Sequence, residues 1–423
     1  MLTREDNSMI CQVGAGTPMG EMMRRYWHPV CTSAQLATPD GAPLRVRLLG
    51  ESYVVFRDDA GKVGFLEELC PHRGASLALG RVENGGIRCL YHGWKFNVTG
   101  AVLETPNFSD PKFRARMKAV AFPVREEGGL VWAYVGPKDL EPEFSRYAFM
   151  DVEPSHRVVL RVNMHCNYLQ RVEAGQDSTH VGMLHTNTAR PGWSDGKFVA
   201  NRDDLNPAAF STDDVEPQLK MEDTAFGFHY VALRKTDRVG VQNARVVPFI
   251  VPYTRVICAR ASYFTVFDVP DDDTHTSTYL VFAADMPVQE DRVLDLLGLN
   301  DEAYYDRKSC NFIATWANTF GQSRDSMIQG NWSGLRGIEV EDAAIALSMG
   351  PLYDRSLEHL VPADQAVVRV RRILLDSVKR VAAGGAPAAV GLDLSGVGGC
   401  DLDLEEGGVW QDLMPSHRPF VPA

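Results

Sequence analysis

The chain has 423 residues, 45% of them hydrophobic and 23% charged, which is an ordinary globular composition with enough length for two or three domains. The formal net charge of -12 argues against nucleic acid as a partner, because phosphate contacts call for a basic face. No apolar run of about 18 residues and no apolar N-terminal segment occurs, so we expect no membrane span, no signal peptide and a cytoplasmic location.

The first third of the chain predicts a short helical segment followed by a small β domain. Thr17-Pro18 is typical of a helix N-cap followed by a proline in the first turn, and we assign residues 1–29 to an N-terminal helical segment. Residues 30–140 contain short alternating apolar runs separated by turns, which predicts an all-β domain. The expected strands are 44–49, 53–56, 63–66 and 131–135.

The remaining residues, 141–423, predict a larger domain that combines an antiparallel sheet with a few helices, so the fold class is α+β. An acidic stretch at 401–406 is expected to be a solvated face. The expected strands are 157–162, 226–234, 245–251, 255–263 and 276–284, and helices are expected within 163–185 and over 340–348 and 363–383.

Two Cys/His pairs lie inside the predicted β domain. Cys70-Pro71-His72 and Cys89-Leu90-Tyr91-His92 are the ends of a 16-residue insertion, residues 73–88, so the two loops can fold back on each other around a metal centre. Four such ligands could hold zinc or an iron-sulfur cluster. The spacing favours a Rieske 2Fe-2S cluster, in which two Cys hold one iron and two His hold the other. The other six cysteines have no regular spacing and are expected to be reduced thiols: Cys11, Cys31, Cys166, Cys258, Cys310 and Cys400.

With these motifs the sequence resembles the Rieske non-heme iron oxygenases, and the resemblance covers almost the whole chain. Its closest branch is the phthalate-dioxygenase-like one, on the runs 16–21, 70–76 and 348–356. Ala75 and Tyr91 stand where respiratory Rieske proteins carry extra cysteines, which favours the oxygenase form. The resemblance implies a Rieske domain followed by a helix-grip catalytic domain.

A second metal site is predicted between residues 177 and 185. His180 and His185 are five residues apart, and a regular helix would leave their side chains about 140° apart. The helix must therefore loosen near Gly182 if both rings are to meet one ion. Two histidines alone would more often be structural, but a Rieske pair upstream favours a facial triad of two histidines and one carboxylate around Fe(II).

In the family that the chain resembles, the carboxylate comes from a helix near the C-terminus. We choose Asp342, with Glu341 and Glu339 as alternatives; a solvated helix charge is the competing interpretation for the two glutamates. The resemblance also implies a catalytic role for Asp177, which would join a histidine of the mononuclear site to a Rieske histidine of a neighbouring subunit. A carboxylate in that place also fixes the imidazole tautomers.

Members of this branch often act on aromatic carboxylates, which need a cation in an otherwise apolar pocket. Arg245 is the first candidate, followed by Arg234 and Arg202, and Ser178 could add a hydrogen bond. The competing interpretation is a surface arginine for each of the three and a helix-surface serine for Ser178.

The resemblance implies an oxygenase component that dihydroxylates phthalate, isophthalate or a substituted benzoate with O₂. Electrons would come from a separate NAD(P)H-dependent flavin/iron-sulfur reductase, and the subunits would form a homotrimer or a dimer of trimers. A Rieske monooxygenase or O-demethylase would have the same metal sites. A Rieske electron-transfer protein is the alternative from a different class, and it would lack the mononuclear iron.

Overall fold

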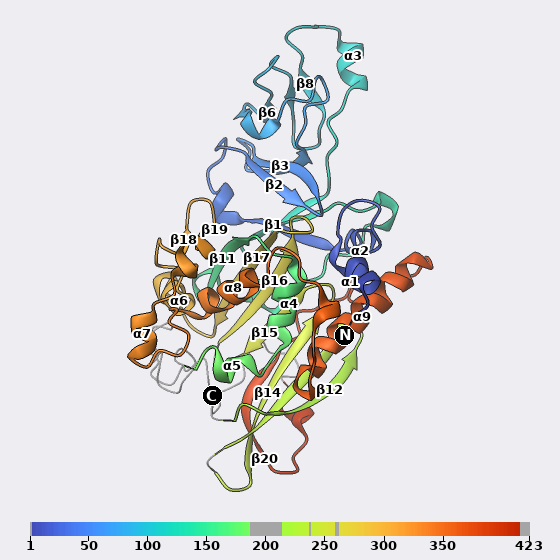
Figure 1. Ribbon diagram of the computed structural model, residues 1–423. Helices are drawn as coiled ribbons and strands as arrows, with labels where there is room; N and C mark the ends of the chain where they lie inside the picture. The colour runs from blue at the N-terminus through green and yellow to red at the C-terminus, as the bar shows by residue number, and fades with distance from the viewer. Residues whose placement is uncertain (1, 187–213, 237, 259–261, 415–423) are drawn as a thin grey trace.

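The computed structural model describes residues 2–186, 214–236, 238–258 and 262–414, and it places a small β lobe at one end of a larger body (Figure 1). Two antiparallel sheets build the lobe, and the strands expected at 44–49, 53–56 and 63–66 are confirmed. The first sheet contains β2 (Leu44–Leu48), β3 (Glu51–Arg57) and β4 (Val63–Glu67); the second contains β5 (Arg81–Glu83), β6 (Gly86–Arg88), β7 (Lys95–Phe96) and β8 (Val102–Glu104), and α3 (Pro111–Arg116) follows.

A third sheet joins the lobe to the body. Its strand order is β1-β10-β9, and every residue of β1 (Trp27–Thr32) and β10 (Leu130–Tyr134) is buried. The third strand is β9 (Val124–Glu127). Side chains of β1 and β10 share one hydrophobic core with the strands of the body, so the lobe is anchored through apolar packing.

The body is built on a ten-stranded, almost entirely antiparallel sheet in the order β12-β13-β14-β15-β16-β17-β11-β19-β18, with β20 paired to β14. The strand predicted at 276–284 is confirmed with those bounds, and all nine of its residues are buried because both faces of the sheet are covered there. The strands are β11 (Arg157–Met164), β12 (Gln218–Thr224), β13 (Gly227–Lys235), β14 (Val241–Ile250), β15 (Thr254–Cys258), β16 (Ser262–Pro270), β17 (Thr276–Ala284), β18 (Tyr305–Asp306), β19 (Asn311–Phe312) and β20 (Cys400–Glu405).

Apart from α3, the helices labelled in Figure 1 lie on the body. The predicted N-cap is confirmed, since the Thr17 side chain accepts a hydrogen bond from the Gly20 amide. Helix α9 packs against α1, α2 and α4. The helices are α1 (Arg4–Cys11), α2 (Pro18–Met23), α4 (Tyr168–Gln176), α5 (His180–Met183), α6 (Glu290–Leu297), α7 (Arg324–Ile328), α8 (Ile338–Ser348) and α9 (Gln365–Ala382). Among the described residues, no helix is both long and apolar enough to cross a bilayer.

One expectation about the sheet is wrong and another holds only in part. The run 255–263 was expected to be one strand, but β15 and β16 pair antiparallel with Cys258 opposite Tyr263, because the apolar run folds back on itself. The acidic stretch 401–406 was expected to be a solvated face, and Asp403, Glu405 and Glu406 are exposed, but Asp401 is fully buried. Strand β20 pairs with β14 and thereby carries Asp401 to a position opposite Arg245.

The turn between β2 and β3 binds directly to the loop that follows β16. The amides of Leu49 and Gly50 donate to the carbonyls of Pro270 and Asp271 at 3.1 and 2.8 Å. Arg47 adds an ion pair of 3.0 Å to Asp272. The lobe is therefore fixed at the end of the body that lies opposite α5 (Figure 1).

Candidate metal centres and substrate cavity

The two Cys/His loops have the same backbone turn. In the first loop the Cys70 amide donates to the carbonyl of Ala75 at 2.9 Å, and the Gly74 amide donates back to the Cys70 carbonyl at 2.9 Å. In the second loop the Gly93 amide donates to the Cys89 carbonyl at 3.0 Å. Both glycines have φ of +73°, a left-handed conformation in which a side chain would be strained. Each cysteine is therefore held at the first position of a five-residue turn.

The four predicted cluster ligands meet in two pairs between these turns, Cys70 with Cys89 and His72 with His92. The thiols of Cys70 and Cys89 are buried, and burial raises the pKa of Cys70 to about 11. The rings of His72 and His92 are 4.6 Å apart between centroids. His92 Nδ1 is buried and has no hydrogen-bond partner among the described residues. Two thiols, two imidazoles and an unsatisfied ring nitrogen fit the ligand set of a Rieske cluster.

Aromatic side chains cover the cluster histidines on one side each. Trp94 is buried and stacks on His72 at 4.6 Å with an interplanar angle of 9°, while its Nε1 donates to Asn107 at 2.9 Å. Tyr91 lies 3.8 Å from His92 between ring centroids and is more than half exposed. Trp94 therefore fixes the orientation of one ring from the interior, and Tyr91 covers the other from the solvent side.

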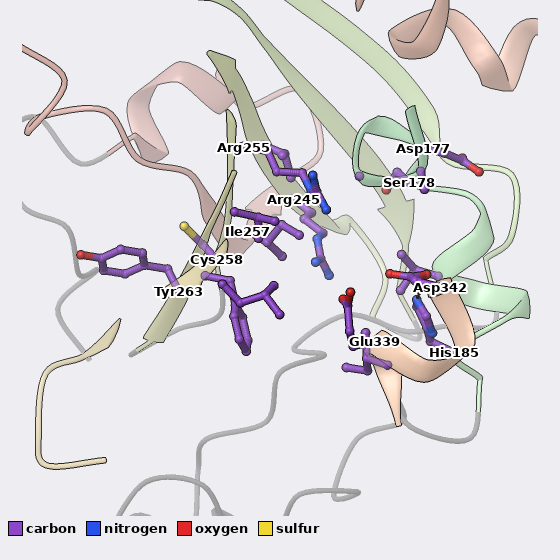
Figure 2. A pocket seen from close by; sticks show the side chains of 18 of the residues that line it. Asp177, Ser178, His185, Arg245, Arg255, Ile257, Cys258, Tyr263, Glu339 and Asp342 are labelled. Carbon is purple, nitrogen blue, oxygen red and sulfur yellow. Dashed lines mark ion pairs between the residues drawn. The ribbon is translucent and has the colours of Figure 1, made fainter. Parts of the chain in front are cut away.

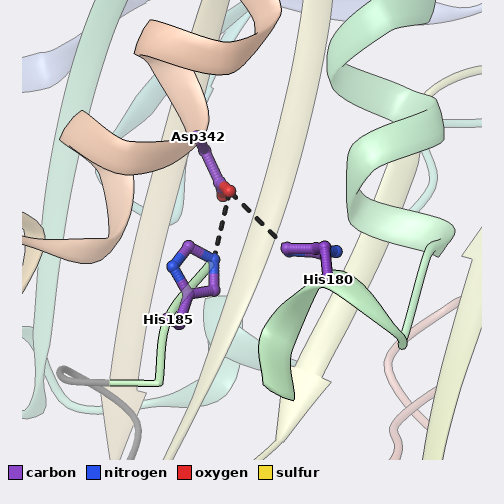
Figure 3. Close-up of side chains that lie close together, drawn as sticks. All are labelled: His180, His185 and Asp342. Carbon is purple, nitrogen blue, oxygen red and sulfur yellow. Dashed lines mark ion pairs between the residues drawn. The ribbon is translucent and has the colours of Figure 1, made fainter. Parts of the chain in front are cut away.

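The structure brings His180, His185 and Asp342 together (Figure 3). One ligand atom from each lies within 4.8 Å of the others, and Asp342 Oδ1 is 3.1 Å from His185 Nε2 and 3.7 Å from His180 Nε2. The predicted loosening of the helix is confirmed, because α5 ends at Met183 and His185 follows it. Despite burial, His185 holds the pKa of Asp342 well below its usual range. Two imidazoles and an ionised carboxylate fit the facial triad that binds Fe(II).

Each of the two triad histidines has a second carboxylate behind its Nδ1 atom. Asp177 Oδ2 lies 3.5 Å from His180 Nδ1. Glu341 Oε2 lies 2.7 Å from His185 Nδ1. Burial raises the pKa of Asp177, but the nearby His180 and the hydrogen bonds from Thr179 outweigh burial and bring that pKa to about 2. Burial lowers the pKa of His185, but its contacts with acidic groups, first of all Asp342, raise it to about 9.

The interpretation of the two glutamates as solvated helix charges is wrong. Glu339 and Glu341 are both buried, and neither is among the three residues whose ligand atoms converge. Glu339 accepts a hydrogen bond of 2.6 Å from Arg171 of α4. Burial raises the pKa of Glu339 to about 7. Glu341 therefore supports His185 from behind, whereas Glu339 is one of the residues that line the cavity next to the triad.

A buried ion network surrounds this support. Arg171 lies 3.9 Å from Asp268 in addition to its bond with Glu339, and Arg255 donates to the same aspartate. Gly175 is packed so closely on this network that a Cβ atom would lie 2.0 Å from Arg255 Nε. Only glycine allows α4 to approach β15 this closely. Sequence reasoning missed Arg171, Asp268 and Arg255, since isolated charges in apolar elements give no signal of the partners they will meet.

A cavity of about 120 Å³ opens next to the triad (Figure 2). Asp342, His185 and Ser178 lie on one side of it, and Arg245 and Arg255 reach into it from the sheet. Most of the remaining wall is apolar and includes Val247, Ile257, Phe264, Leu280, Phe282 and Ile338. The cavity can therefore receive an apolar molecule that carries a negative group.

The predicted substrate residues have different positions. Arg245 lines the cavity and is buried, and its Nη1 lies 3.8 Å from Asp401. Arg234 does not line it, but donates to the backbone oxygen and the Oγ of Ser178 at 2.6 and 2.8 Å. Burial lowers the pKa of Arg234 to about 10. Ser178 is buried, so the interpretation as a helix-surface serine is wrong. Arg202 lies outside the described residues.

Two known families match successive parts of the chain. Residues 26–120 match the Rieske [2Fe-2S] domain family, and residues 133–398 match the family described as LigXa C-terminal domain like. The second match covers more than half of the chain. A Rieske domain joined to this catalytic domain defines an iron-dependent oxygenase, and the chain belongs to the Rieske non-heme iron oxygenases.

Within this family the chain is similar over nearly its whole length to oxygenase subunits with known substrates. It is 38% identical to the phthalate 4,5-dioxygenase oxygenase subunit of Pseudomonas putida, over 92% of this chain and 89% of that protein. It is 32% identical to the 3-chlorobenzoate-3,4-dioxygenase oxygenase subunit of Comamonas testosteroni, over 91% and 90%. It is 30% identical to the 5,5'-dehydrodivanillate O-demethylase oxygenase subunit of Sphingobium sp., over 92% and 84%.

Solved structures show the same fold at lower identity. NdmA of Pseudomonas putida CBB5 with caffeine superimposes with a TM-score of 0.58 at 20% identity, covering 86% of this chain and 94% of that one. Dicamba monooxygenase bound to dicamba gives a TM-score of 0.57 at 17% identity, covering 85% and 98%. The enzyme is thus a Rieske non-heme iron oxidoreductase that uses a 2Fe-2S cluster and a mononuclear iron.

Proposed function

We propose that the enzyme dihydroxylates a monocyclic aromatic carboxylate, namely phthalate, isophthalate or a substituted benzoate, with O₂. The observation that carries this proposal is the position of Arg245, which lines an otherwise largely apolar cavity that also contains the residues of the iron triad. The cavity volume of about 120 Å³ is on the scale of a single aromatic ring, since an engineered protein cavity of about 150 Å³ binds benzene.

The ligand assignment belongs to this proposal. Cys70, His72, Cys89 and His92 would hold the 2Fe-2S cluster, and His180, His185 and Asp342 would hold the mononuclear Fe(II). The cluster supplies single electrons, and the iron supplies the activation of O₂. The protein contributes position and the exclusion of water, since the cavity beside the triad is walled mainly by apolar side chains.

The guanidinium of Arg245 would orient the substrate. A carboxylate bound to Arg245 leaves the apolar ring of the substrate between this residue and the triad, with Ser178 as a second polar contact. Arg255 lines the same cavity but donates a hydrogen bond to buried Asp268, whereas Arg245 Nη1 lies 3.8 Å from Asp401, so Arg255 is held more tightly within the fold than Arg245. Arg234 would act indirectly, because its two hydrogen bonds fix Ser178.

Asp177 would carry electrons from a neighbouring subunit. Its side chain contacts His180 and is about one quarter exposed, so a second group can reach it from outside. In Figure 1 the β lobe lies at the top and α5 in the lower half of the molecule, so the lobe is well separated from the helix that follows Asp177. A head-to-tail homotrimer, or a dimer of such trimers, would bring a neighbouring cluster histidine to Asp177.

The names of the relatives support an aromatic carboxylate and a separate electron donor. Phthalate and 3-chlorobenzoate are substrates of the two dioxygenases, and all three relatives are oxygenase subunits. The donor would be an NAD(P)H-dependent flavin/iron-sulfur reductase, which fits a cytoplasmic enzyme because reduced nicotinamide is found there. O-demethylation of a methoxylated aromatic acid is the second candidate, since the third relative is an O-demethylase subunit.

A single-turnover experiment tests the reaction without the natural reductase. The chemically reduced holoenzyme is mixed with phthalate, isophthalate or a chlorobenzoate and with doubly labelled O₂, and the product is analysed by mass spectrometry. Two labelled oxygen atoms in the organic product support dihydroxylation, whereas one labelled atom or loss of a methyl group supports the second candidate. About three irons per chain are expected; about two irons and no product would contradict both.

The Arg245→Gln variant tests how the substrate is recognised. We expect its Kd for the favoured carboxylate to rise about 10- to 100-fold, because a charge-assisted hydrogen bond is lost. The double variant Arg245→Gln/Asp401→Asn avoids leaving a buried aspartate uncompensated and should show the same loss. Exposed Arg336→Gln is the matched control. An equal effect on the uncharged carboxamide of the same substrate would contradict the assignment.

A further inference from the structure

The two triad histidines differ in what lies behind them. Asp177, behind His180, is about one quarter exposed and lies at a distance of 3.5 Å. Glu341, behind His185, is 1% exposed at its side chain and lies at 2.7 Å. The first carboxylate can be reached by a partner, but the second is enclosed by its own chain. The two carboxylates therefore cannot have the same role.

Glu341 is fixed through both of its oxygens. Oε2 contacts His185 Nδ1, and Oε1 accepts a hydrogen bond of 2.6 Å from Ser333 Oγ. Ser333 is itself buried, and its Oγ accepts a bond of 3.1 Å from the Leu335 amide. The carboxylate thus has one orientation, set by the loop that precedes α8 and by the helix itself.

This orientation determines how His185 faces the metal position. With Nδ1 bonded to Glu341, the other nitrogen, Nε2, lies 3.1 Å from Asp342 Oδ1 and faces the point where the three ligands converge. A carboxylate that accepts from Nδ1–H selects the tautomer with a free lone pair on Nε2 and makes that nitrogen a stronger donor. Two neighbouring residues of α8 therefore have different roles: Asp342 would be a metal ligand, and Glu341 supports the ligand His185.

We propose that Glu341 is a positioning residue that holds His185 for the mononuclear iron, with Ser333 as its anchor. This inference rests on the proposed triad of His180, His185 and Asp342. It assigns to Glu341 a role distinct from that of Asp177, because Glu341 supports metal binding from the interior and has no access to another subunit.

The test measures metal binding by the full chain with its cluster intact and its mononuclear iron removed by chelation. Anaerobic titration with Fe(II) alone gives the Kd, and titration with Co(II) gives a ligand-field spectrum that reports the coordination. Glu341→Gln should weaken Fe(II) binding about 10- to 100-fold and change the Co(II) spectrum, because the amide carries no charge to polarise His185. Restoring the carboxylate with Glu341→Asp should recover part of the affinity.

Ser333→Ala is the second variant, since it keeps every charge and loosens only the anchor. We expect a smaller loss of Fe(II) affinity, up to about tenfold, with unchanged cluster absorption. If Glu341→Gln does not fold, Ser333→Ala alone tests whether the Glu341 carboxylate positions His185. Exposed Glu302→Gln is the matched control for loss of one negative charge.

Two outcomes separate this inference from the proposal on which it rests. If Asp342→Ala abolishes Fe(II) binding while Glu341→Gln and Ser333→Ala bind it like the wild type, the positioning role is refuted and the triad stands. If Asp342→Ala binds Fe(II) like the wild type, the triad itself is wrong, and the role of Glu341 is refuted together with it.

Discussion

The two predicted metal sites are built in opposite ways. All four cluster ligands come from 23 consecutive residues, 70–92, and local backbone hydrogen bonds shape both loops. In the catalytic domain, 157 positions separate His185 from Asp342, and the ligands meet only because separate helices pack together. A site made of neighbouring residues depends on its turns, whereas a site made of distant residues depends on the tertiary structure.

The packing of α4 on α8 provides that tertiary support. Gln170 of α4 donates to the carbonyls of Ala346 and Gly350 at 2.8 and 3.0 Å. Arg171 adds its buried bond to Glu339 one turn before the predicted ligand Asp342. These contacts set the register of α8 against the segment that carries the two histidines. The mononuclear site should therefore be the more sensitive of the two to distant changes.

The largest expected effect comes from Asp342→Ala, which removes one of three ligands from the distant site. Fe(II) affinity should fall by more than about 100-fold, because loss of a ligand exceeds the loss of an outer-shell partner. The cluster, which is formed locally in the other lobe, should keep its visible absorption and both of its irons. Iron and sulfide analysis with absorption spectroscopy measures both sites in one sample. Loss of the cluster as well would show that the two sites are not independent.

Asp177→Asn should have a smaller effect, and it should slow electron transfer between the two metal sites. Both metal centres should remain occupied, while turnover falls about 100-fold, because asparagine keeps the shape of the side chain and loses the charge between two imidazoles. Steady-state oxygen uptake with substrate, beside metal analysis, checks this. Coupled turnover at the wild-type rate would refute the relay role of Asp177.

The smallest effect concerns the packing between the two regions. His28 of β1 is fully buried between the Tyr253 hydroxyl and the Met23 carbonyl, and burial lowers its pKa to about 4. Below pH about 6.5, His28 is protonated in the unfolded chain but stays neutral in the folded chain. The free energy of unfolding should therefore fall by about 3 kcal/mol as the pH drops from about 6.5 to about 4.

Denaturant unfolding at several pH values measures this loss, and His28→Gln should flatten the dependence in that range. Because His28 contacts Tyr253, in the turn between strands β14 and β15 of the large sheet, the lobe and the body should lose stability together. Cluster absorption that persists after the catalytic domain has unfolded would show that the two regions are separate folding units.

The success of sequence reasoning followed the same division. Strands β2, β3 and β4 of the lobe could be predicted because turns and alternation are local signals, whereas the shorter strands β5 to β8 were not predicted. The prediction of one strand over 255–263 was wrong, because the sequence there contains no turn signal to indicate that β15 and β16 run in opposite directions. Strand β20 was missed because its acidic residues suggested solvent, while pairing with β14 decides its place.

In the site, the residues that converge could be named in advance, but their environment could not. The histidine spacing predicted the break in the helix before His185. The burial of Glu339 and Glu341 depends on Arg171 and Ser333, which no local pattern connects with them. The resemblance to a family pointed to Arg245, but not to the buried Asp401 that the sheet brings near it.

The repeated turn in the β lobe has a consequence for the reduction potential of the cluster that it would hold. Both loops place a cysteine first and a glycine fifth, but the histidine is third in one loop and fourth in the other. The turn thus allows a ligand at its third or its fourth position, and its backbone conformation does not depend on which side chain is the ligand. Thiolates in place of His72 and His92 would give the ligand set of a plant-type ferredoxin, whose reduction potential lies roughly 250 to 700 mV lower than that of a Rieske centre. The side chains of His72 and His92 would therefore set the driving force for electron transfer into the cluster and onward to the mononuclear iron.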